Sequence, residues 1–226
     1  MIEVEEFGAR LRALGWVSDL LVAGSLATGD HIPGVSDLDL VAIVTGPVDP
    51  AAVAGVHDAF DESLKLGCVY VDERTRLDVR VEHPTWTHGL FVQRILSGVT
   101  RAELVRHGHA VFGRPPTELF PAMTDDDLRA AARAELAGYW SRAARRPWLW
   151  RHPFMADLSL TSMARGRHTL KHGSLLTKSA AIEQSAAPEW LRAGLRARRR
   201  GETVSSRRWR TALIAWRDVR RTVAMA

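Results

Sequence analysis

The chain has 226 residues, enough for one large or two small domains, and 46% of them are hydrophobic, which supports an ordinary buried core. No apolar run has the length of a membrane span, and the acidic start from Met1 to Glu6 does not resemble a secretory signal. With Cys68 as the single cysteine, an internal disulfide is excluded. We therefore expect a cytoplasmic protein without membrane association.

The net charge is +5, and of the 31 lysines and arginines only Lys65, Lys171 and Lys178 are lysine. Arginines gather toward the C-terminus, which is compatible with a nucleic-acid surface or with solvated helix faces. The run lacks the interleaved aromatic residues of a base-stacking surface, so solvated faces are favoured and nucleic acid is not an expected partner.

The first half of the chain alternates helix and strand patterns. A helix is expected over residues 3–14, and another over Pro50–Leu66 with Asp49 as its N-cap. The expected strands are Trp16–Ala23, Asp37–Val44, Cys68–Val71 and Leu77–Val81.

From about residue 115 the pattern becomes purely helical, after Arg114-Pro115-Pro116, which resembles a linker. The expected helices are Asp125–Ala144, Asp157–Leu170, Leu175–Ser185, Glu189–Arg200 and Thr203–Thr222. The prediction is an α+β protein with an α/β domain at 1–115, containing a short mixed sheet, and an all-α domain at 116–226.

Two short motifs in the first half point to phosphate and metal chemistry. Gly24-Ser25 forms a turn after an apolar strand and offers backbone N–H groups and a hydroxyl to a phosphate. Asp37 and Asp39 stand at i and i+2 of the next strand, so their carboxylates share one face and can hold a divalent cation. Together these motifs predict phosphoryl or nucleotidyl transfer.

A third carboxylate is expected on a neighbouring strand that faces the same way. In the predicted strand Leu77–Val81 the apolar residues alternate with Asp78, which could complete a metal site and accept the proton of an attacking hydroxyl. Glu82 and Asp72 are alternatives of the same parity. The competing interpretation is that Asp78 is a solvent-facing carboxylate paired with Arg80.

The residues from Gly24-Ser25 to Ser36-Asp37-Leu38-Asp39-Leu40 resemble the signature of the DNA-polymerase-β-like nucleotidyltransferase superfamily. The segment from Val105 to Phe120 is similar to the link between domains in aminoglycoside 3''-adenylyltransferases, which modify streptomycin and spectinomycin. The resemblance implies an N-terminal nucleotidyltransferase domain and a helical domain, with ATP and substrate in the cleft between them.

Carrying the functional residues over gives a defined set of expectations. The resemblance implies phosphate contacts from Gly24, Ser25 and Ser36, metal ligands at Asp37 and Asp39, and a base at Asp78, where the family has a glutamate. In the helical domain it implies that Arg165 and Lys178 bind the ATP phosphates, with Gly173 also in register. The substrate-reading Trp, Asp and His of the family have no clean counterparts, and the residues of similar type stand at shifted positions: Trp148, Trp150, His152 and Asp157.

For these four residues a packing role is an equal alternative, with both tryptophans anchoring helices and Asp157 capping one. The overall expectation is a monomeric adenylyltransferase of the antibiotic-resistance type, which uses two Mg²⁺ ions to transfer AMP from ATP to a hydroxyl of a small polar molecule such as an aminoglycoside. Two alternatives remain open. One is a different natural product or a protein side chain as acceptor, and the other is an inactive nucleotidyltransferase fold that binds nucleic acid.

Overall fold

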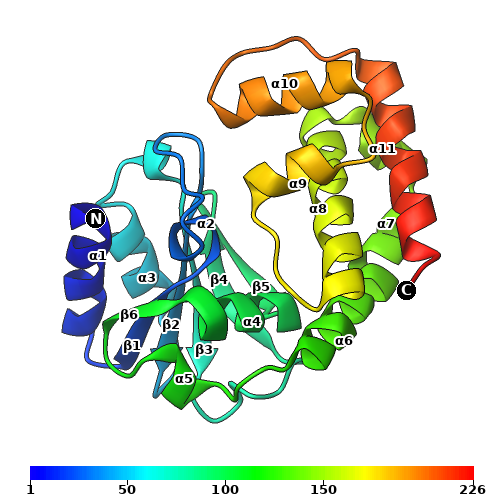
Figure 1. Ribbon diagram of the computed structural model, residues 1–226. Coiled ribbons are helices and arrows are strands. Elements are labelled where there is room, and N and C mark those ends of the chain that lie inside the picture. Colours follow the sequence, from blue (N-terminus) through cyan, green and yellow to red (C-terminus); the bar gives the residue numbers. More distant parts are fainter. The chain divides into compact units, whose positions relative to one another are not determined.

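The computed structural model describes residues 1–226 and divides into two units, Met1–Ala122 and Met123–Ala226 (Figure 1). In the first unit one mixed sheet carries helices on both faces. The strands are β1 (Val17–Val22), β2 (Leu38–Val44), β3 (Leu66–Asp72), β4 (Glu82–Thr87), β5 (Leu90–Ile95) and β6 (His109–Phe112). The helices are α1 (Ile2–Ala13), α2 (Gly24–Ala27), α3 (Pro50–His57), α4 (Gly98–His107) and α5 (Pro116–Leu119), with a 3-10 turn at Glu62–Leu64.

The strand order is β5-β4-β3-β2-β1-β6, with β2 and β3 parallel and all other neighbours antiparallel. Alternate residues of the central strands face opposite layers, as the two-residue period of a strand requires. Leu40 and Tyr70 pack with α1 and α3, whereas Val41 and Val71 pack with Leu104 of α4. The predicted short mixed sheet is confirmed.

The predicted strand Leu77–Val81 is wrong, because this segment forms turns between β3 and β4. Leu77 and Val79, expected in the core, are 55% and 52% exposed. The strands that follow were not predicted, since Glu82–Thr87 is largely polar. The sequence feature that could have revealed this hairpin is His88-Gly89 between the two strands. Both residues have positive φ, of 49° and 71°, as a two-residue type I′ hairpin turn requires.

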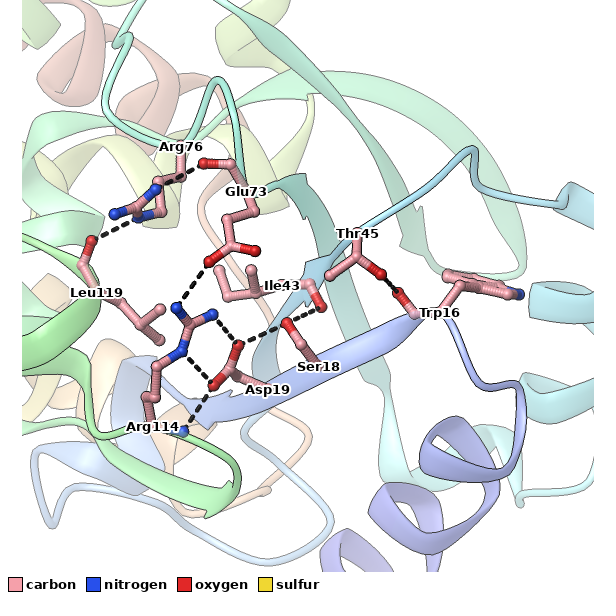
Figure 2. A network of polar contacts seen from close by, with 9 residues as sticks. All are labelled: Trp16, Ser18, Asp19, Ile43, Thr45, Glu73, Arg76, Arg114 and Leu119. Atoms are coloured by element: carbon pink, nitrogen blue, oxygen red, sulfur yellow. Dashed lines mark hydrogen bonds and ion pairs between the residues drawn. The ribbon is translucent and has the colours of Figure 1, made fainter.

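At one end of the sheet, charged side chains form a network of hydrogen bonds and ion pairs (Figure 2). Asp19 of β1, only 1% exposed, accepts hydrogen bonds from Nε and Nη2 of Arg114 at 3.0 and 2.7 Å, and Arg114 Nη1 reaches Glu73 at 2.7 Å. The backbone N–H of Arg114 donates to the same carboxylate at 2.6 Å. The Arg-Pro-Pro segment therefore begins with a residue that is firmly bonded to the sheet.

The second unit is entirely helical. Its elements are α6 (Asp125–Glu135), a π-helical turn (Leu136–Trp140), α7 (Ser141–Ala144), a 3-10 helix (Pro147–Arg151), α8 (Pro153–His172), α9 (Lys178–Gln184), α10 (Glu189–Arg199) and α11 (Arg208–Val223). Met163 of α8 and Val219 of α11 are fully buried in its core. Arg167 of α8 also reaches Asp218 of α11 at 2.8 Å. No helix of either unit is long and apolar enough to cross a membrane.

Candidate functional site

The turn after β1 is built around the carboxylate of Asp39. Gly24 has φ of +58°, and a Cβ atom placed on it would lie 2.2 Å from Asp39 Oδ2. Ala23, just before the turn, donates its N–H to the carbonyl oxygen of Asp39 at 2.9 Å. Both the backbone conformation and the available space therefore require glycine at position 24.

Ser25, the next residue, is only 7% exposed, and its Oγ is buried without a hydrogen-bond partner. A buried hydroxyl without a partner costs free energy, typically about 1 to 3 kcal/mol. The neighbouring hydroxyl of Thr28 does not relieve it, because Thr28 Oγ1 donates to the carbonyl oxygens of Gly24 and Ser25. The turn thus holds a hydroxyl that a bound oxyanion would satisfy.

The loop before β2 is held in place by Ser36 and Lys65. Ser36 is 4% exposed and accepts a hydrogen bond from the Ile32 N–H at 3.0 Å, while Lys65 Nζ donates to the Val35 carbonyl at 2.9 Å. Because its Oγ accepts a hydrogen bond within the loop, Ser36 stabilises the conformation of the segment that precedes Asp37 and Asp39.

Asp37 and Asp39 flank Leu38, which is 1% exposed, whereas Asp37 is half-buried and Asp39 is exposed. Alternation along the chain puts both carboxylates on the side away from Leu38. Two carboxylates of this kind fit Mg²⁺, which binds one or two carboxylates and takes further ligands from water and substrate phosphates. No group of three or more His, Cys, Asp or Glu side chains is gathered for a metal.

The predicted third carboxylate does not join this pair. Asp78 lies in the turns beyond β3 and bonds with Arg80, whose N–H and Nε reach Asp78 Oδ1 at 2.9 and 3.2 Å. The hydrogen bonds from Arg80 lower the pKa of the Asp78 carboxyl. The contact between Asp78 and Arg80 is the surface ion pair that was the competing interpretation of the sequence. It follows the C-terminal end of β3, whereas Asp39 pairs with the N-terminal end of that strand.

The two substitutes for Asp78 are also misplaced. Asp72 pairs with Val44 across β2 and β3, and Val44 faces the α1 layer. Glu82 lies on the same face of β4 as Trp86, four residues later, and Trp86 packs against the α1 layer. Val41 and Ile43 alternate with buried residues in the same way as Asp39 and face the α4 layer, so Asp39 lies on the α4 face of the sheet. Asp72 and Glu82 therefore lie on the opposite face from Asp39.

In the second unit the structure brings Arg165 to the segment that carries Lys178. Arg165 Nε donates to the carbonyl oxygen of Leu176 at 2.8 Å, two residues before Lys178, the first residue of α9. Gly173 ends α8 with φ of +65°, where a Cβ atom would lie 2.5 Å from Asp125 Cβ. Gly173 is thus needed for the turn that returns the chain toward Arg165.

Of the four residues expected to contact the acceptor substrate, two are engaged within the protein and two are exposed. Trp150 is 1% exposed and stacks on Trp140 inside the core, and Asp157 is bound by Arg198 at 2.5 and 3.0 Å. Burial raises the pKa of Asp157, and Arg198 opposes that rise. Helix α8 begins at Pro153, so Asp157 does not cap it. Trp148, which is 61% exposed, and the exposed His152 remain accessible to a ligand.

No family model matches the chain, and neither does the sequence of any curated protein. In three dimensions the chain is similar to the crystal structure of a spectinomycin adenyltransferase from Enterococcus faecialis with ATP and spectinomycin. The TM-score is 0.70 at 13% sequence identity, and the match covers 96% of this chain and 98% of that one. The chain therefore has the fold of this adenyltransferase, as the resemblance in its sequence predicted.

Proposed function

We propose that the chain transfers AMP from ATP to a hydroxyl of a small polar molecule such as an aminoglycoside and releases pyrophosphate. The observation that carries the proposal is the Gly24 turn, where the Asp39 carboxylate lies against Gly24 and the Ser25 hydroxyl is buried without a hydrogen-bond partner. A turn that offers N–H groups and a hydroxyl, next to a carboxylate that could bind a metal, suits a nucleoside triphosphate bound with a divalent cation. The fold shared with an adenyltransferase supports the same reaction.

Each residue has a defined part in this proposal. Ser25 and the N–H groups of its turn would bind phosphate oxygens, and Asp37 and Asp39 would hold two Mg²⁺ ions. Bound Mg²⁺ would neutralise charge on the triphosphate and polarise its phosphoryl oxygens. In the second unit, Arg165 and Lys178 supply positive charge for the phosphates.

The acceptor contacts are assigned to Trp148 and His152. An exposed indole can stack on the apolar face of a sugar or an aminocyclitol ring and can attract an ammonium group by a cation–π interaction. Trp150 and Asp157 are left out, since the first is in the core and the second is bound by Arg198.

The nucleic-acid alternative is not supported by the pairing of the C-terminal arginines. Most arginines of α10, and Arg200 directly after it, are bonded to carboxylates of the same unit, which reduces the positive charge that they offer to a polyanion. The pairs are Arg192–Glu189, Arg196–Glu183, Arg196–Glu189 and Arg200–Glu202, with N···O distances of 2.7 to 2.8 Å.

Pyrophosphate release tests the proposal. The protein is incubated with ATP and Mg²⁺ and with a panel of aminoglycosides, including spectinomycin and streptomycin, and of hydroxylated metabolites without amino groups. We expect acceptor-dependent release and an AMP ester detectable by mass spectrometry. The matched variants Asp78→Asn and Glu82→Gln remove carboxylates at the other end of the sheet and should keep this activity. Absence of turnover with every acceptor, together with unchanged ATP binding in the Asp37→Ala/Asp39→Ala variant, would refute the proposal.

A further inference from the structure

The two units carry opposite net charges. Residues Met1–Ala122 include 10 lysines and arginines against 17 aspartates and glutamates, a net charge of −7. Residues Met123–Ala226 include 21 against 9, a net charge of +12. A division of charge of this size within one chain is typical of proteins that bind a polyanion. The positive charge that such a partner would meet therefore belongs to the helical unit.

Helix α11 exposes a row of arginines that have no carboxylate partner. Its inner side is formed by buried residues such as Ala215 and Val219, and its exposed side carries four arginines: Arg210, Arg217, Arg220 and Arg221. None of the four forms an ion pair. The one acidic residue from Thr203 to Ala226 is Asp218, which is 4% exposed and is bonded to Arg167 at 2.8 Å. The exposed side of this helix therefore keeps its positive charge.

Helix α10 differs from α11 in this respect. Arg192 is bonded to Glu189 at 2.7 Å, and Arg196 is bonded to Glu183 and Glu189 at 2.7 and 2.8 Å. When an unpaired arginine binds a phosphate of a nucleic acid, counterions condensed on the nucleic acid are released, and their release drives association. A paired arginine must first leave its carboxylate. The pairing that weakens α10 as a surface for polyanions is absent from the exposed side of α11.

Tryptophans are interleaved with unpaired arginines in the folded unit. Three arginines lie over indole rings, with distances from Cζ to the ring centroid of 4.9 to 5.3 Å, and none of the three forms an ion pair. The pairs are Arg151 with Trp209, Arg207 with Trp190 and Arg220 with Trp216. The arginine run in the sequence does not show this pattern, because two of the pairs join residues 58 and 17 positions apart. Folding therefore brings together the cations and aromatic rings that are typical of surfaces for unpaired bases.

Trp209 is the indole best exposed for stacking. It is 66% exposed, and Leu213, one turn later, is 43% exposed. Residues four apart lie on the same side of a helix, so Trp209, Leu213 and Arg217 form one exposed strip. Helix α11 has 16 residues, which at 1.5 Å per residue is about 24 Å and spans several nucleotides of a single strand. An exposed indole beside unpaired guanidinium groups can stack on a base while the arginines bind the flanking phosphates.

We infer that the exposed side of α11 binds single-stranded nucleic acid with little dependence on base sequence. Trp209 stacks on an unpaired base, since every base offers a flat aromatic face. The phosphates on either side bind the free guanidinium groups of the helix: Arg210, Arg217, Arg220 and Arg221. This binding function is additional to the proposed transfer of AMP and does not depend on it.

The salt dependence of binding tests the role of the arginines. A fluorescein-labelled oligouridylate of about twelve nucleotides is titrated with the intact chain and followed by fluorescence anisotropy. Arg217→Gln should weaken binding and lower the slope of log affinity against log salt by about 0.7, the value for one phosphate contact to a single strand. Arg192→Gln removes the same charge from a paired arginine of α10 and should change the affinity by less than about twofold. Equal losses in the two variants, or no binding at about 50 mM salt, would overturn the inference.

Substitution of Trp209 tests whether bases are bound as well as phosphates. Trp209→Ala should lower the affinity for oligouridylate by about tenfold, within the usual effect of losing one stacked base, and Trp209→Phe should keep most of the affinity. Heparin, a polyanion without bases, should bind both variants as it binds the wild type. Unchanged oligouridylate affinity in Trp209→Ala, or an equal loss of heparin affinity, would contradict stacking on Trp209.

Two further measurements separate this surface from other functions. Vesicles that contain phosphatidylserine test an anionic lipid as the partner, and binding of the vesicles without binding of oligouridylate would overturn the inference. Arg217→Gln should keep acceptor-dependent pyrophosphate release, because Arg217 is not among the residues proposed to bind ATP or the acceptor. If oligouridylate binds as expected but no acceptor supports turnover, the proposed function fails and the nucleic-acid surface stands.

Discussion

Asp19 and Asp39 occupy opposite ends of two neighbouring strands, and each lies against a glycine with positive φ. A Cβ atom on Gly113 would be 2.5 Å from Asp19 Oδ1, and one on Gly24 would be 2.2 Å from Asp39 Oδ2. Asp19 is 1% exposed and receives three hydrogen bonds from Arg114 and one, at 2.6 Å, from the Ser18 hydroxyl. Asp39 is exposed and stands by a buried hydroxyl that has no partner.

Under the proposed function, this difference separates a structural carboxylate from a functional one. Close approach to a glycine is common to both ends, so it does not distinguish them. The distinguishing feature is whether the polar groups around the carboxylate are satisfied by the protein. At the Asp19 end they are satisfied, whereas at the Asp39 end Ser25 retains unused hydrogen-bonding capacity.

Exchanging each aspartate for asparagine should separate the two roles most strongly. Asp39→Asn should lower acceptor-dependent pyrophosphate release by about 1,000-fold, the upper end for loss of one group that stabilises transition-state charge, with little change in urea stability. Asp19→Asn should instead lower the free energy of unfolding, while the folded fraction of this variant keeps the kcat of the wild type. Loss of activity without loss of stability in Asp19→Asn would remove the distinction between the two ends.

Removing the guanidinium at the structural end should have the next largest effect. Arg114→Met leaves the buried Asp19 charge without its counterion and should cost about 2 to 3 kcal/mol, less than for a fully buried pair because Arg114 is 39% exposed. The exposed pair of Arg10 and Glu6 supplies the control, since Arg10→Met should change the stability by less than about 0.5 kcal/mol. Urea denaturation at pH 7 measures both values.

The same variant should invert a pH dependence. In the native protein burial acts to raise the pKa of Asp19, but the hydrogen bonds from Arg114 and Ser18 outweigh it and leave the pKa below the ordinary value of 3.8. This contribution to stability is present above about pH 4 and is lost as the pH falls through the folded-state pKa. Without Arg114, burial raises the pKa, so acidification from pH 7 to 5 should stabilise Arg114→Met relative to wild type. A parallel decline of both proteins would contradict this account of Asp19.

The smallest effect is expected at Ser25. Ser25→Ala removes the unpartnered hydroxyl, so the free energy of unfolding should stay the same or rise by up to about 1 kcal/mol. ATP affinity should fall by about tenfold, which corresponds to one hydrogen bond to a charged group. Calorimetry with ATP and thermal unfolding provide the two values. A destabilised variant with unchanged ATP affinity would place Ser25 among the structural residues.

The sequence was informative where the determinants are local. Gly24, Ser25, Asp37 and Asp39 lie within sixteen residues, and the strand period alone places both carboxylates on one side of Leu38. The change to an all-helical second half was visible for the same reason, because helical periodicity is local.

Local pattern was insufficient where long-range pairing decides. Leu77 to Val81 alternates like a strand, but no neighbouring strand pairs with it, and the polar strands β4 and β5 are paired by a hairpin instead. Asp157 resembled a helix cap because its partner, Arg198, is 41 residues away. The position of Gly67 opposite Asp39 depends in the same way on strand register, which composition does not reveal.

The position of β6 has a consequence for folding of the chain during synthesis. β6 pairs with β1, and Arg114 bonds to Asp19 across a sequence separation of 95 residues. Until residues 109–114 have left the ribosome, β1 is an edge strand with an open row of backbone donors and acceptors, a surface that favours aggregation. The first unit therefore closes slowly and late, because long-range contacts carry a large loop-closure entropy. The helices of the second unit form their backbone hydrogen bonds locally, so we expect the slow step of folding to belong to the sheet that carries Asp39.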